Sequence, residues 1–313
     1  MIHFSFLSST RATLVERLQR RLAALMYPPG TGPEDFAQPA GEPALLAADA
    51  LTWRVFANPL AMFVGGVTAV LLELAEPRVR TGVWEHTAFR TEPLARMRRT
   101  GHAALMTAYG PRSRAEAMIA RINAAHARIC GRTPGGQPYA ASDVELLTWV
   151  HATAAHGFLQ AYVRYVRPLS GPERDAYYAE NAAPARLYGV LEPVCSEREF
   201  EALLQAMRPR LEPSAIVLEF LDIVRRMPLL PLPLRGVQRM LVAAAVQNLP
   251  AELRAHLGLG GRAWRLGAAG TWLLRRLARA TDDLSLPTLP AVVARRRVAA
   301  SAASPDAGSA AQS

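Results

Sequence analysis

Two histidines in this sequence lie at apolar positions of predicted helices. His126 shares one helical face with three isoleucines spaced three or four residues apart, Ile119, Ile122 and Ile129. His151 belongs to a similar seam with alternating spacings of four and three, formed with Leu147, Ala154, Phe158, Ala161 and Tyr165. An imidazole on an apolar face needs a hydrogen-bond partner or a metal ion. Each histidine is therefore either a hydrogen-bonded core residue or a ligand.

A polar cluster lies upstream, in a predicted helix over residues 93–108. Arg96, Arg99 and Thr100 are related by steps of three and four residues, so they share a face. Two guanidinium groups and a hydroxyl group can bind carboxylates, such as haem propionates, or polarise a bound oxygen species. The alternative is a solvated basic turn. Glu85 and His86 are adjacent, but adjacent helical residues diverge, so their spacing alone predicts no catalytic pair.

Composition excludes several protein classes. The chain has 313 residues, of which 50% are hydrophobic and 20% charged, so it can bury a large core and is not disordered throughout. Its two cysteines, Cys130 and Cys195, exclude a disulfide scaffold and are not spaced as metal ligands. The motifs of phosphate-binding loops, zinc hydrolases and serine hydrolases are absent. No secretory signal is recognisable, so we expect a cytoplasmic protein, soluble or peripheral at a membrane.

The positive charge is concentrated near the C-terminus. All 36 basic residues are arginines, and residues 225–297 hold 13 of them against only three acidic residues. Because no nucleic-acid-reading module is visible, we expect no nucleic-acid partner. Within residues 262–279, tryptophans and leucines alternate with arginines. This composition suits a helix on an anionic membrane surface, and equally a helix packed on the domain with its arginines in water.

The residue pattern predicts an all-α fold in a single multi-helix domain, because helix formers dominate and alternating β-branched runs are scarce. The apolar run over residues 60–72 is too short to span a bilayer and is expected in the core. Helices are expected over residues 9–26, 44–57, 60–75, 93–108, 112–130, 142–166, 171–187, 197–207, 213–226, 234–247 and 263–280. The expected organisation is an N-terminal helix and Pro/Gly-rich loop (1–49), a core (50–225), a basic C-terminal helical layer (226–300) and a disordered tail (301–313).

A series of short motifs resembles one known family. In chain order they are Asn58-Pro59, Gly65-Gly66, 71–77, 82–90, Arg96-x-x-Arg99-Thr100, His126, 135–139, Asp143, 149–153, 167–170 and Tyr177-Tyr178-x-Glu180. Their kind and order are similar to a large bacterial family long described as a domain of unknown function. That family is grouped with the fungal oxygenase that cleaves a farnesyl side chain in mycophenolic acid biosynthesis, and with the latex-clearing rubber oxygenases. The resemblance covers about residues 50–225.

This resemblance implies a b-type haem in a slot between long helices. It also implies an oxygenase that uses molecular oxygen to cleave or oxygenate a hydrophobic, often isoprenoid, substrate. By similarity, His126 corresponds to the histidine that ligates the haem iron from the proximal side. Arg96 and Thr100 correspond to polar residues beside the haem.

Three further positions follow from the same resemblance. Arg99 stands where a rubber oxygenase carries a lysine that can cap the iron, but an arginine stays protonated and cannot ligate. His151 matches a structural or haem-proximal position, so which of the two histidines binds iron stays open. Glu85 is a candidate distal base.

The sequence also departs from the family pattern. Glu76 replaces the usual histidine before Pro77, Glu73 stands where a neutral amide is common, and Cys130 stands where a basic residue is usual. The alternatives to a haem oxygenase are a haem-binding protein without turnover and a cofactor-free helical protein that binds a membrane surface or a partner.

Overall fold

Side-chain caps fix where the two central helices begin. Asn58 accepts hydrogen bonds from two backbone amides, at 3.1 and 3.0 Å, and starts α4 (Pro59–Ala75). Asp143 accepts from two amides in the same way and starts α8 (Val144–Tyr165). Both caps are local signals, which explains why the sequence predicts these two helices well.

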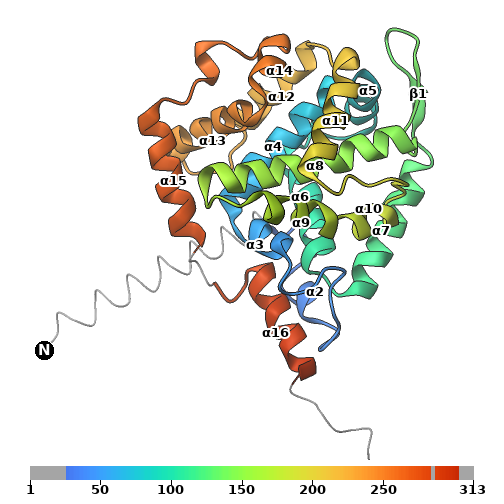
Figure 1. Ribbon diagram of the computed structural model, residues 1–313, viewed down its shortest axis with the longest axis vertical. Helices are drawn as coiled ribbons and strands as arrows, with labels where there is room; N and C mark the ends of the chain where they lie inside the picture. Colours follow the sequence, from blue (N-terminus) through green and yellow to red (C-terminus); the bar gives the residue numbers. More distant parts are fainter. Residues whose placement is uncertain (1–25, 283–285, 303–313) are drawn as a thin grey trace, which may run out of the picture.

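The computed structural model describes residues 26–282 and 286–302 (Figure 1). The other α-helices are α2 (Glu34–Ala37), α3 (Leu51–Ala57), α5 (Pro77–His86), α6 (Pro93–Tyr109), α7 (Arg112–His126), α9 (Gly171–Glu180), α10 (Ala182–Leu187), α11 (Glu197–Met207), α12 (Ala215–Arg226), α13 (Arg235–Asn248), α14 (Ala251–His256), α15 (Ala268–Asp282) and α16 (Pro290–Ala302). Short 3-10 helices are η1 (Arg208–Arg210), η2 (Leu232–Leu234) and η3 (Arg262–Trp264). The strands β1 (Cys130–Arg132) and β2 (Pro138–Ala140) form an antiparallel hairpin. The all-α prediction is confirmed.

Two glycines allow α4 and α8 to pack closely at the centre of the molecule. A Cβ atom on Gly65 would lie 2.6 Å from the Cα atom of Phe158. A Cβ atom on Gly157 would lie 2.4 Å from the carbonyl oxygen of Gly65. Such distances are too short for any side chain, so only glycine at both positions permits this approach of the two backbones.

The other helices cover different sides of this central pair. Thr68 of α4 donates a hydrogen bond to the carbonyl oxygen of Ala245 in α13, at 3.1 Å. Asn58 donates to the carbonyl oxygen of Ala278 in α15, at 2.8 Å. On the other side, α6 packs against α3 and α7, and α7 packs against α10. Figure 1 shows α13 and α15 at the left of the central pair and α7 and α10 at the right.

Two predicted helix boundaries are wrong because distant or polar side chains decide them. The helix predicted over residues 44–57 begins only at Leu51, where the carboxylate of Glu180 accepts hydrogen bonds from two amides of the first turn. The helix predicted over residues 171–187 is divided at Asn181, whose side chain bonds back to the preceding turn and across to α3. The contact between Glu180 and the start of α3 joins distant parts of the chain, so a local sequence pattern does not predict it.

Other elements differ from the sequence pattern as well. The helix predicted over residues 112–130 ends at His126, and the chain continues into the hairpin, for which strand signals are weak. The pattern does not predict α5, α14 or α16. The helix expected over 263–280 begins at Ala268, after η3 and Gly267.

Two remaining expectations concern the ends of the chain and membrane-spanning helices. Residues 9–25 of the first predicted helix and residues 303–313 of the predicted tail lie outside the described part of the chain. No single helix among the described residues has the length and apolarity to cross a bilayer. The pair of α3 and α4 passes that test together by length and composition, with a bend of 97° between the two helices.

Candidate functional site

One face of α4 keeps accessible surface although most of the helix is buried. This face carries residues spaced by three, four and three positions, namely Phe63, Gly66, Val70 and Glu73. At a rise of 1.5 Å per residue, it extends for about 15 Å. The face is therefore an apolar strip with a single carboxyl group at its C-terminal end.

Glu73 is paired electrostatically, but not in contact, with an arginine of α6. Burial raises the pKa of Glu73 to about 7, although the positive charge of Arg96 lowers it. Burial also lowers the pKa of Arg96, against the effect of Glu73, while Arg99 lowers it further. Among the described residues, Glu73 and Arg96 form no ion pair within 4.0 Å. The charge of each group thus shifts the pKa of the other, although the two side chains are not in contact.

Both predicted histidines lie in the same electrostatic neighbourhood. His126 is the last residue of α7, and burial, followed by Arg96, lowers its pKa. His151 lies on α8, where burial and the nearby His126 lower its pKa to about 4. Both imidazoles are therefore neutral at pH 7, which is the form that binds a metal.

The ring nitrogens and ring faces of these histidines have different surroundings. The Nδ1 atom of His126 is buried and has no hydrogen-bond partner within the part of the chain that the structure describes. The ring of His151 lies 4.7 Å from that of Tyr188, measured between centroids. The Tyr188 hydroxyl is 2.9 Å from the Oγ1 atom of Thr107 and so links this group to α6. Glu73, Arg96 and the two histidines all keep part of their surface accessible.

The structure therefore brings together Arg96, His126 and His151 from three different helices. It adds Glu73 and Tyr188, neither of which is a predicted site residue. The available signal for Glu73 is that it is a charged residue placed directly after a long apolar helical run. Tyr188 has no comparable local signal, because it follows α10 and reaches the site only through the fold.

The other two residues of the basic cluster are more exposed. Arg99 and Thr100 both lie on the exposed surface of α6. The Thr100 hydroxyl donates a hydrogen bond to the carbonyl oxygen of Arg96, at 3.0 Å, within its own helix. The positive charge of Arg99 lowers the pKa of Arg96. Their predicted roles beside a cofactor stay predictions.

Glu85 lies apart from this group. It is exposed near the end of α5 and accepts a hydrogen bond from the hydroxyl of Tyr139 in β2, at 3.4 Å. The Nε2 atom of His86 is 3.0 Å from the same hydroxyl. The charges that shift the pKa values of His126 and His151 do not include Glu85. The structure thus places Glu85 at the hairpin, and its role as a distal base stays a prediction.

Two of the three departures from the family pattern, Glu76 and Cys130, lie outside the group around the histidines. Glu76 is almost fully buried, accepts a hydrogen bond from the Val79 amide at 2.8 Å and thereby caps α5. It also pairs with Arg78 at 2.7 Å. Cys130 is exposed at the start of β1. Neither residue touches the group around the histidines through any of these contacts.

The donor set is compatible with a haem. Within the described residues, no group of three or more His, Cys, Asp or Glu side chains could hold a metal ion. A haem needs only one or two axial ligands, since the porphyrin supplies the other four. A neutral imidazole whose ring is not committed to hydrogen bonds, near the guanidinium groups of Arg96 and Arg99, matches that requirement.

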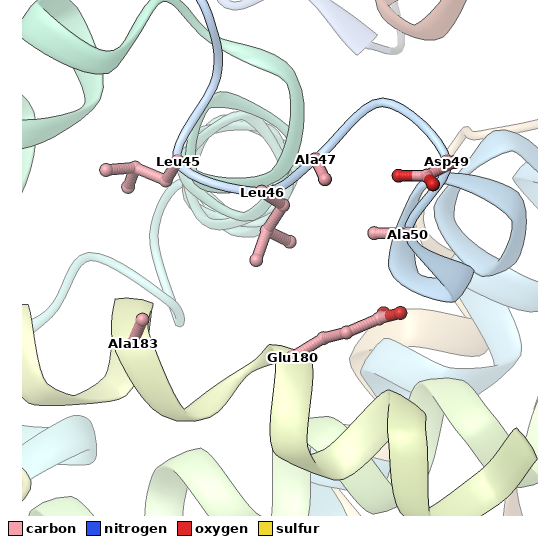
Figure 2. Close-up of a pocket in the computed structure, with 7 residues that line it drawn as sticks. All are labelled: Leu45, Leu46, Ala47, Asp49, Ala50, Glu180 and Ala183. Carbon is pink, nitrogen blue, oxygen red and sulfur yellow. The ribbon is translucent and has the colours of Figure 1, made fainter.

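Two surface pockets lie elsewhere. One of about 310 Å³ is lined by Leu45, Leu46, Ala47, Asp49, Ala50, Glu180 and Ala183 (Figure 2). One of its two carboxylates, that of Glu180, is already used to cap α3. A second pocket, of about 620 Å³, lies between the N-terminus of α6 and the end of α12. Neither pocket contains one of the two predicted histidines.

Comparison with known proteins gives one match. The family model described as ER-bound oxygenase mpaB/B'/rubber oxygenase, catalytic domain, matches residues 53–282, which is more than half of the chain. The match begins close to the start of the resemblance found in the sequence and continues into the basic C-terminal segment. No curated protein and no solved structure matches the chain. The chain belongs to the mpaB/rubber oxygenase catalytic-domain family, a family of oxygenase-type enzymes.

Proposed function

We propose that this protein is a haem b-dependent oxygenase that acts on a hydrophobic substrate, with isoprenoids as the class that the family suggests. The observation that carries the proposal is the convergence of two neutral imidazoles and a half-buried arginine near the apolar strip of α4. Neutral imidazole, cationic groups and apolar walls are the three features that a haem slot needs.

His126 is the residue that would bind the haem iron. It lies at the C-terminal end of α7, and its low pKa keeps the ring unprotonated, so a nitrogen lone pair is free at neutral pH. In most metal-binding histidines the second ring nitrogen donates to a carbonyl or carboxylate oxygen. The Nδ1 atom of His126 has no such partner, so packing alone would orient this ring.

Arg96 and Arg99 are proposed to hold the anionic edge of the cofactor. Guanidinium groups bind carboxylates through paired hydrogen bonds, and neither arginine uses its charge in an ion pair among the described residues. Arg96 is the deeper of the two, since it is half-buried while Arg99 is exposed. Loss of Arg96 should therefore have the larger effect.

The bound haem would supply the chemistry of oxygen activation. The protein residues would orient the reactants and control protons. Glu73 has a pKa of about 7, so near neutral pH its carboxyl oxygen can either hold or accept a proton. The apolar strip that ends at Glu73, with Phe63 and Val70, would exclude water and hold a hydrocarbon chain.

The test is haem content after replacement of each histidine. Purified wild type, expressed with haem precursor, is expected to show a Soret band and b-type haem near one per chain in a pyridine haemochrome assay. His126→Ala should lose the haem, whereas His151→Ala should keep it and mainly lose stability. Stoichiometric haem in His126→Ala would overturn the assignment of the ligand.

The same samples distinguish the alternatives. A wild-type protein that stays colourless after haem titration would favour a cofactor-free helical protein. A coloured protein that consumes no oxygen with any isoprenoid would favour a haem-binding protein without turnover. Arg96→Ala should retain some haem but lose oxygen consumption, and unchanged turnover would exclude a role for Arg96.

A further inference from the structure

The outer face of α15 combines exposed apolar side chains with arginines. Trp272 is 62% exposed and Leu273 is 38% exposed, while Leu274 and Ala278 of the same helix are buried against the domain. The helix is thus held by one face and leaves a tryptophan and a leucine in water on the other. Large apolar side chains that remain exposed next to each other mark interaction surfaces.

The charges around these two residues have one sign. Arg275, Arg276 and Arg279 are exposed on the same helix, and the guanidinium carbon of Arg276 lies 5.5 Å from the centre of the Trp272 ring. No acidic residue occurs in the sequence between Glu252 and Asp282. Arg275 is tied to the domain, since its Nε donates to the carbonyl oxygen of residue 164 at 3.1 Å. The other two arginines make no ion pair among the described residues.

We propose that this face, formed by Trp272, Leu273, Arg276 and Arg279, docks the protein on an anionic phospholipid bilayer. Tryptophan prefers the level of the lipid headgroups, and arginine side chains beside it reach anionic phosphates. A protein partner would need a matching acidic surface with a pocket for the tryptophan, whereas a bilayer offers both features to any exposed helix of this kind. Charge complementarity therefore favours the lipid surface as the occupant.

The outer face of α15 is separated from the polar end of the candidate site. α15 contacts α4 at Asn58, the residue that caps its N-terminal end, whereas Glu73 lies near the C-terminal end. Fifteen residues of helix correspond to about 22 Å. Figure 1 shows α15 at the left edge of the molecule, away from α7 and α10. Membrane docking by α15 and the proposed oxygenase activity can therefore be tested separately.

The test is co-sedimentation of the full chain with vesicles of phosphatidylcholine, with or without phosphatidylglycerol. We expect binding to the anionic vesicles only, with weakening by salt. Arg276→Gln combined with Arg279→Gln should weaken binding about 25-fold, because each basic side chain near an anionic surface contributes about fivefold. Trp272→Ser should weaken it by at least about fivefold.

Matched controls come from another part of the surface. Leu191→Ser removes a leucine that is 71% exposed, and Arg186→Gln with Arg198→Gln removes two exposed arginines. These variants should bind vesicles as the wild type does. Equal loss in the controls would show that binding depends only on total charge or hydrophobicity and would overturn the proposal.

Tryptophan fluorescence gives a second readout. Trp272 is the most exposed of the five tryptophans, so its emission should shift to the blue when vesicles are added. Trp272→Phe should keep the binding and lose the shift. Absence of vesicle binding at low salt would refute the proposal. Tighter binding to RNA than to vesicles, unaffected by Trp272→Ser, would assign the face to nucleic acid instead.

Discussion

Replacement of Glu73 by glutamine tests whether this carboxyl group is held in an environment that disfavours its charge. Glu73→Gln keeps the shape of the side chain and removes its ability to ionise. Burial raises the pKa of Glu73 to about 7, so the folded protein holds a proton that the unfolded chain releases. The wild type is therefore most stable below the ordinary pKa of 4.5 and loses stability as the pH rises through 7.

The magnitude follows from the shift in pKa. A change from 4.5 to about 7 corresponds to at most about 3.4 kcal/mol when the carboxyl group is fully ionised. About 2.5 kcal/mol of this develops between about pH 5 and about pH 8. Glu73 keeps part of its surface accessible, and solvent screening reduces the expected difference to about 1–2 kcal/mol. Arg96 stays protonated over this range and does not change the sign.

The assay is urea unfolding of the wild type and Glu73→Gln at several pH values between about 5 and 8. As the pH rises across this interval, the free energy of unfolding of the wild type should fall by about 1–2 kcal/mol more than that of the variant. Glu85→Gln serves as the control, because Glu85 is exposed, and its profile should parallel that of the wild type. Parallel profiles for Glu73→Gln and wild type would refute the argument that burial controls this carboxyl group.

Four further substitutions test packing and helix capping by urea unfolding. Gly65→Ala should destabilise the protein by about 2–3 kcal/mol or prevent folding, whereas Gly101→Ala, in the open middle of α6, should stabilise it by about 1 kcal/mol. Equal effects of these two substitutions would contradict the close approach of α4 and α8. Asn58→Ala should cost about 1–2 kcal/mol through loss of the cap of α4 and of the bond to α15; no change would refute both roles. Glu76→Ala should cost about 3 kcal/mol, since it leaves Arg78 half-paired and α5 uncapped; a smaller loss than for Asn58→Ala would contradict this account.

Elements with local caps and a clear apolar period are predicted well from the sequence. The helix predicted over residues 197–207 coincides with α11, where Ser196 accepts a hydrogen bond from the amide of Glu199 and Phe200 faces the core. His126 and His151 are found for the same reason, because each lies at a regular position of an amphipathic helix. Local periodicity indicates which way a side chain points.

The remaining features depend on contacts between distant parts of the chain. α3 begins at Leu51 because a carboxylate of α9, Glu180, accepts from its first amides, and no local signal marks that position. The adjacency of Glu85 and His86 predicts no pair, yet both reach the hydroxyl of Tyr139 on a hairpin that the pattern does not predict. The sequence does not predict the hydrogen-bond partner of a polar group when that partner belongs to an element that the pattern does not indicate.

The position of the candidate site follows from how α4 is held. One side of α4 is fixed against α8 at Gly65, where the backbones are too close to move toward each other. A second side is fixed to α13 by the hydrogen bond from Thr68. The third side, which ends at Glu73, keeps accessible surface. Because the first two contacts hold α4 in place, the position of its third face is fixed relative to α8 and α13. Arg96 and the two histidines share an electrostatic neighbourhood with Glu73 at the end of this face, so the rigidity of the α4–α8 pair would help to hold the proposed cofactor-binding residues in position.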